Sequence, residues 1–172
     1  MKYLTIEEIR EVGQVANNCD KHKLQLAINE AFDFDLRPLI DCYYIDLKEH
    51  WEDDEGKWFD IINPKEFDSN CVECGYHFGL KRVLAYFAYA RYMILNEYND
   101  TPNGNVAKTN NFSIPTDIRL LKDRANAYRQ MAKDTFKEIN NYILANSKEY
   151  PKYFSGKTKA KGFGFKIKNI YK

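Results

Sequence analysis

The sequence has few of the residues on which catalytic sites and membrane anchors depend. Its 172 residues include three histidines and four cysteines, and no recognisable signature places a Ser or Cys nucleophile beside a histidine. No apolar run approaches the roughly 18 residues of a membrane span, and the charged start MKYLTIEEIREV does not fit a signal peptide. These absences favour a non-enzymatic, soluble protein from a reducing compartment, with cysteines that are free rather than bridged.

Two motifs that suggest catalysis lack the context it requires. Gly156-Lys157-Thr158 is similar to the end of a phosphate-binding loop, but Pro151 stands where that loop needs glycine. Four aspartates near the expected second and third helices could supply paired carboxylates, yet solvated acidic helix faces explain them better: Asp33, Asp35, Asp41 and Asp46. We therefore expect no catalytic residues.

The segment Cys71-Val-Glu-Cys74-Gly-Tyr-His77 has two thiols and an imidazole at spacings that a zinc ion could use. Cys19 and His22 offer a second partial set, but a zinc site needs a second close pair at a known spacing, and Cys42 falls on an expected helix. We interpret the cysteines as free thiols and expect no metal or cofactor, with a zinc-dependent fold as a third hypothesis.

Two long helices are expected in the second half of the chain. Apolar residues recur at spacings of three and four from Leu80 to Tyr98, which predicts a central, nearly surrounded helix. After a connection over residues 101–115, Asp117 or Thr116 can cap a helix of about 45 Å whose other face is charged throughout. Its heptad-like seam comprises Ile118, Leu121, Ala125, Tyr128, Ala132, Thr135, Ile139 and Tyr142.

Shorter helices are expected in the first half. A capping box at Thr5 starts a first helix that is predicted to end near Asn17, and Asp20 can cap a second. Pro38 fits the first turn of a third helix, which would end before an acidic cluster. Residues 56–79 are expected to form an irregular or short-helical connection.

Charge and aromatic residues favour an interaction surface. Since residues 151–172 carry +7 in a chain of net charge +1, residues 1–150 carry −6. Within the basic segment, GFGFKIK places Phe163, Phe165 and Ile167 on one side of an extended strand, which predicts an arm that adds to a sheet edge or lies in a groove of a neighbouring subunit. A disordered tail is the alternative. The 13 tyrosines exceed what one core needs, and Tyr is frequent at protein contacts, although many could instead line helix boundaries.

One part of the chain resembles a known family. The run LKRVLAYFAYARYMILNEYNDTPNGNVAKTNNFSIPTDIRLLKDRANAYRQMAKDTFKEINNYI is similar to the head-tail connector (adaptor or ring) proteins of tailed bacteriophages, particularly those of crAss-like phages. The resemblance covers roughly Thr5 to Phe154, and its most specific part is the helix with Ala88-Tyr89-Ala90-Arg91, the polar loop and the long helix. It implies a helical subunit, commonly twelve copies to a ring, that binds the portal protein and downstream tail components at the virion head-tail junction, and no active site.

We therefore expect an all-α bundle of four or five helices (residues 1–148) with a long C-terminal amphipathic helix and an extended basic arm of β-strand character (residues 149–172). Genomic DNA could pass through the ring without sequence-specific contact. The expected contact residues lie in the arm, the connection and the acidic cluster: Lys157, Lys159, Lys161, Phe163, Phe165, Lys166, Ile167, Lys168, Asn103, Asn105, Lys108, Phe112, Glu52, Asp53, Asp54 and Glu55.

The alternative is a small cytoplasmic nucleic-acid-binding or regulatory module. Lysines of the arm could follow phosphates while interleaved rings, Tyr153 and Phe154 among them, stack on bases. The arm has no arginine, which specific base reading would favour, so this binding would be nonspecific. Within a connector, the acidic cluster of an adjacent copy could attract the same lysines.

Overall fold

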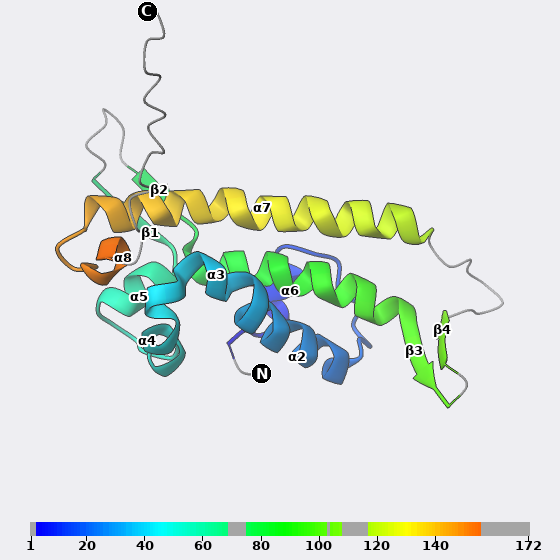
Figure 1. Ribbon diagram of the computed structural model, residues 1–172. Helices are drawn as coiled ribbons and strands as arrows, with labels where there is room; N and C mark the ends of the chain where they lie inside the picture. Colours follow the sequence, from blue (N-terminus) through cyan, green and yellow to red (C-terminus); the bar gives the residue numbers. More distant parts are fainter. Residues whose placement is uncertain (1–2, 69–74, 103, 108–116, 156–172) are drawn as a thin grey trace, which may run out of the picture.

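The computed structural model describes residues 3–68, 75–102, 104–107 and 117–155, and this part of the chain is mostly helical (Figure 1). That result confirms the predominantly helical class and both long helices. In chain order the helical segments are α1 (Ile6–Arg10), α2 (Lys21–Glu30), the π-helical η1 (Ala31–Leu36), α3 (Arg37–Ile40), the 3-10 turn η2 (Asp41–Tyr43), α4 (Tyr44–Glu49), α5 (Lys57–Ile62), α6 (Gly79–Glu97), α7 (Ile118–Ala145) and α8 (Lys152–Ser155).

Two small antiparallel hairpins interrupt the helical pattern, so the described part of the chain is mostly rather than exclusively helical. Strand β1 (Lys65–Phe67) pairs with β2 (Gly75–His77), and β3 (Tyr98–Thr101) pairs with β4 (Gly104–Ala107). The first hairpin lies in residues 56–79, the segment expected to form an irregular or short-helical connection. The second overlaps the connection expected over residues 101–115, but β3 already begins at Tyr98, the last residue of the expected helix. Strands of three or four residues are too short to show a readable apolar alternation, which is why the sequence pattern did not reveal them.

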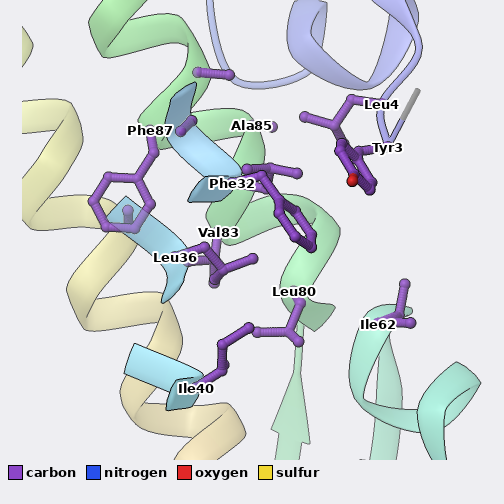
Figure 2. Packing of buried hydrophobic residues seen from close by; sticks show 14 of the residues in the cluster. Tyr3, Leu4, Phe32, Leu36, Ile40, Ile62, Leu80, Val83, Ala85 and Phe87 are labelled. Atoms are coloured by element: carbon purple, nitrogen blue, oxygen red, sulfur yellow. The ribbon is translucent and has the colours of Figure 1, made fainter. Parts of the chain in front are cut away.

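Helix α6 is the element around which the body packs. Helix α2 and η1 lie along one side of it and α7 lies along another (Figure 1). Figure 2 shows side chains from η1 and α3, such as Leu36, meeting Leu80, Val83 and Phe87 of α6 in one apolar cluster. Burial is greatest in the first part of the helix and declines beyond Tyr92; the buried residues are Gly79, Leu80, Val83, Leu84, Ala85, Phe87, Ala88, Tyr89, Ala90 and Tyr92.

Helix α7 spans the length of the body, as its periodicity predicts. Asp117 caps it by accepting a hydrogen bond from the backbone N–H of Arg119 at 2.8 Å. The seam residues Leu121, Ala125 and Ala132 are buried, together with Ile139 and Tyr142. Two further buried side chains on the same face, Phe136 and Ile143, thicken the seam toward its C-terminal end.

The N-terminal helix is shorter than predicted. The capping box of Thr5 and Glu8 is present, but α1 ends at Arg10 rather than near Asn17. The reason is tertiary: Gly13 lies directly against the ring of Tyr89, where a side-chain Cβ would come within 2.5 Å of the ring carbons. The chain leaves the helix there to pass over α6, while Asp20 caps α2 as expected.

Residues beyond the long helix remain part of the body. Tyr150 is fully buried, and its hydroxyl donates a hydrogen bond to the backbone carbonyl of Lys57 at 2.6 Å. Tyr153 is 3 % exposed, and its ring stacks with that of Tyr43. The packed body therefore continues at least to Tyr153, five residues past the expected domain limit at residue 148.

Gly79 joins β2 to α6 under a steric constraint that can be tested. Its φ is +79°, and a Cβ there would lie 2.5 Å from the backbone carbonyl oxygen of Ile62. Gly79→Ala should lower the free energy of unfolding by at least about 3 kcal/mol, because left-handed strain adds to a clash with backbone. Gly56→Ala is the matched control, since Gly56 has φ +92° with open space around it, and it should cost about 1–2 kcal/mol. Urea unfolding measures the free energy of unfolding of both variants. Equal decreases in the two variants would contradict a steric clash at residue 79.

Candidate interaction site

An acidic loop follows α4. Glu52, Asp53, Asp54 and Glu55 lie between α4 and α5, and all four side chains are exposed. Asp53 is paired with the ring Nδ1 of His50 at 2.8 Å. The predicted acidic contact residues are thus accessible to a partner, and the loop turns at Gly56.

A groove lies beside this loop, and its floor is aromatic. The Nε1–H of Trp51 donates a hydrogen bond to the carbonyl oxygen of Tyr3 at 2.8 Å. The ring of Tyr3 stacks on that of Phe32, with ring centroids 4.1 Å apart and planes 5° from parallel. These contacts hold Tyr3 at φ +74°, a conformation that is unusual for a tyrosine. The floor is therefore fixed from two sides.

Two hollows of about 160 and 130 Å³ form this Tyr3–Trp51 groove, and Tyr3, Trp51 and Glu52 line both of them. Acidic and basic side chains stand at the walls. Lys81 pairs with Glu8 at 3.5 Å, and Lys48 lines the smaller hollow with its ammonium 5.6 Å from the centre of the Tyr44 ring. Glu49 and Glu52 form no ion pair within the described part of the chain. The groove thus combines an apolar floor with a net acidic wall that continues into the loop.

The basic segment begins at the α4 end of the body. Lys152 reaches Asp46 of α4 at 3.4 Å, and the hydroxyl of Tyr43 accepts a hydrogen bond from the backbone N–H of Tyr153. Burial raises the pKa of the Tyr153 hydroxyl, consistent with a ring enclosed by protein. Tyr153 is consequently not available to stack on nucleic-acid bases, which corrects one part of the alternative hypothesis.

Most of the other predicted contact residues lie outside the described ranges. They are Lys157, Lys159, Lys161, Phe163, Phe165, Lys166, Ile167, Lys168, Asn103, Lys108 and Phe112. Asn105 belongs to β4, where its backbone opposes that of Asp100. For all of these residues the expected contacts stay predictions.

The sequence predicts that the outer face of α7 is charged throughout, but the structure shows exposed apolar side chains on it. Leu120 is 55 % exposed and Met131 is 48 % exposed. Their separation of eleven residues is close to three helical turns, so both project from one flank of α7, and exposed Ala127 lies between them. A row of two or three apolar residues among many charged ones gives no continuous hydrophobic periodicity, so the sequence pattern did not predict this exposed row.

A second exposed apolar surface was also missed. Tyr76 and Phe78 are 44 % and 43 % exposed and meet edge to face with ring centroids 5.0 Å apart. The guanidinium of Arg82 lies 5.7 Å from the centre of the Phe78 ring and pairs with Glu11 at 3.1 Å. Tyr76 and Phe78 are two residues apart in the sequence, but only the structure shows that both side chains are exposed and in contact at the β2 to α6 turn.

The aspartates of the second and third helical segments are not simply solvated. Both carboxylate oxygens of Asp35 accept hydrogen bonds from Arg91 of α6, which also contacts Glu30 at 2.9 Å. The carboxylate of Asp33 accepts a hydrogen bond from the Tyr44 hydroxyl. The Arg91 pairs tie α2 and η1 to α6, and the Asp33–Tyr44 hydrogen bond ties η1 to α4.

His77 is fully buried and has a defined tautomer. Its Nδ1 accepts a hydrogen bond from the backbone N–H of Gly79 at 3.2 Å, so in the neutral ring Nε2 carries the proton. The Nε2 atom is buried and has no hydrogen-bond partner among the described residues. Cys71 and Cys74 lie outside the described residues, and within the described ones no cluster of His, Cys, Asp and Glu is placed to hold a metal.

Residues 39–162 match the model of a protein family of unknown function, DUF6712. The match spans well over half of the chain, and the chain belongs to that family. Comparison with curated proteins and with solved structures found no match. Within the described ranges, no helix is both long enough and apolar enough to span a bilayer.

Burial gives His77 a testable role in pH dependence. Desolvation, with a smaller contribution from nearby Lys65, lowers the pKa of His77 from 6.5 to about 4, against the opposing charge of Asp60. The unfolded chain therefore binds a proton that the folded chain excludes, and stability is lost as pH falls from about 6.5 toward 4.

This group should account for about 2 kcal/mol of lost stability between pH 7 and pH 5. His77→Gln should remove that part of the pH dependence, whereas His22→Gln, at an exposed position of α2, should retain it. Urea unfolding at both pH values gives the comparison. An identical pH slope in native protein and His77→Gln would show that another group is responsible.

Proposed function

We propose that this protein is a head-tail connector subunit that assembles into a ring beneath a phage portal, as its resemblance to the connector family implies. Its work is then mechanical: it prolongs the DNA channel and provides a docking surface for tail components. The observation that carries the proposal is the separation of opposite charges, with an exposed acidic loop on the body and a lysine-rich segment at the C-terminus.

The separation of acidic and basic surfaces on one subunit suits head-to-tail association. A heterologous interface joins two different surfaces of identical subunits, and repetition around an axis closes a ring when the rotation allows. A basic arm and an acidic loop are two different surfaces of this kind. Attraction between them guides encounter and sets orientation, and many modest contacts around a ring act together.

Exposed apolar side chains add further contact surface. Leu120 and Met131 on α7, the Tyr76–Phe78 pair and Phe34 of η1 are all well exposed. Single exposed apolar residues are common in any protein, so the support comes from their grouping on α7 and at the β2 to α6 turn. Tyrosine abundance by itself does not support an interface, because seven of the tyrosines in the described ranges are buried: Tyr3, Tyr43, Tyr89, Tyr92, Tyr142, Tyr150 and Tyr153.

The mass of the native assembly tests the proposal. The full chain, alone and mixed with the portal protein of the same genome, should give a closed oligomer in native mass spectrometry and bind the portal. Deletion of residues 156–172 removes no described core residue, so it should leave a helical monomer of unchanged circular dichroism that no longer assembles.

Three results would count against this function. A full-length chain that stays monomeric and ignores the portal would contradict it directly. Unchanged assembly after the deletion would remove the arm from the mechanism. A salt-dependent gel shift with random duplex DNA, abolished by the same deletion in a chain that never oligomerises, would favour the nucleic-acid-binding alternative.

A further inference from the structure

We propose that the Tyr3–Trp51 groove is the receptor for the C-terminal arm of a neighbouring copy, with Phe163 and Phe165 of that arm seated in its two hollows. This inference deepens the proposed ring function and relies on it for assigning the arm to a second copy. The proposed function requires only attraction between the basic arm and the acidic loop, whereas this inference assigns the arm to a groove of defined shape.

The size of the hollows fits aromatic rings. A volume of about 150 Å³ is large enough to hold a benzene ring. The two hollows measure about 160 and 130 Å³, and they adjoin because Tyr3, Trp51 and Glu52 line both. The arm carries two phenylalanines two residues apart, which an extended strand places on one side, about 7 Å from each other. Two neighbouring hollows thus match two neighbouring rings.

The chemistry of the walls fits the rest of the arm. Three carboxylates (Glu8, Glu49, Glu52) and two lysines (Lys48, Lys81) line the hollows, which leaves them net acidic. Glu49 and Glu52 have no ion-pair partner among the described residues, and the acidic surface continues into the loop. The arm supplies Lys157, Lys159 and Lys161 before its phenylalanines and Lys166 after them, with no acidic residue. An aromatic strand with lysines at both ends meets an aromatic floor with carboxylates at its edge.

Contacts within the body hold the floor in place before binding. Trp51 is held by its hydrogen bond to the Tyr3 carbonyl, and Tyr3 is clamped on Phe32. A receptor that does not need to reorganise loses less free energy on binding, so a short arm can suffice. The Tyr76–Phe78 surface, by contrast, borders a neutral pocket in which Lys81 and Arg82 already balance Glu8 and Glu11. It offers lysines no such attraction.

Photo-crosslinking of the full chain locates the arm. Phe165→p-benzoylphenylalanine is expressed once with natural nitrogen and once with nitrogen-15, and the two preparations are mixed, dissociated, reassembled and irradiated. Crosslinked peptides should contain Tyr3 or residues 48–52, and a large share should pair a light with a heavy peptide. Lys166→p-benzoylphenylalanine, on the opposite side of the strand, is the control and should give far fewer crosslinks to these residues.

The effect of substitutions on self-association gives an independent test of the groove. Phe163→Ala with Phe165→Ala should weaken self-association at least about tenfold, and Ile170→Ala should change it little. Glu52→Lys and Lys161→Glu should each weaken association, and a chain carrying both changes should recover part of the loss. None of these positions belongs to the described core, so the folded monomer serves as the common reference.

The outcomes separate the two proposals. Light peptides crosslinked only to light ones would mean that the arm folds onto its own body. Crosslinks to other residues would place the arm on another surface. Either result overturns the groove assignment, and rings that still bind the portal would uphold the connector function. Mixed-isotope crosslinks in the groove of a protein that forms only dimers and ignores the portal would uphold the assignment and overturn the connector function.

Discussion

The packing of α6 between α2–η1 on one side and α7 on another is the constraint on which the rest of the structure depends. Ala85, Ala88 and Ala90 on α6 keep its surface low enough for neighbouring helices to approach, while its larger residues fill the space between them. Arg91 reinforces one side through its pairs with Asp35 and Glu30, which join α6 to the end of α2 and to η1. With α6 enclosed, polar and charged surface is left to α7, the acidic loop and the hairpins.

The aromatic residues have a different role from the one that composition suggested. Tyr43 and Tyr150 meet Trp58 of α5 edge to face, and they also contact each other. Tyr153 stacks on Tyr43, and Tyr142 meets Tyr150 edge to face. Their hydroxyls reach hydrogen-bond partners at the boundary of the core, as buried tyrosines usually do. This cluster closes the body at the end where the basic segment starts. What remains for partners is a smaller and more localised surface than the abundance of tyrosine implies.

The acidic loop, the groove and the start of the basic segment together describe how one subunit could meet the next. The loop is accessible, the groove is preformed, and α8 attaches the base of the arm to the body through Tyr153 and Lys152. For a member of a family without an established function, this arrangement gives the connector hypothesis specific residues to examine. On that hypothesis, modest contacts repeated around an axis would hold the assembly together, rather than one strong interface.

The sequence by itself determined the helical class, the caps at Thr5, Asp20 and Asp117, and the buried face of α7, because these follow from local hydrogen bonds and from periodicity within one helix. The exposed acidic loop was equally readable. Only the tertiary structure decided where α1 ends, which tyrosines are buried, that hairpins flank α6, and that Tyr3 and Trp51 form a groove. Each of these depends on contacts between residues far apart in the chain, such as Gly13 with Tyr89, Tyr150 with Lys57 and Trp51 with Tyr3, and local patterns carry no record of such contacts.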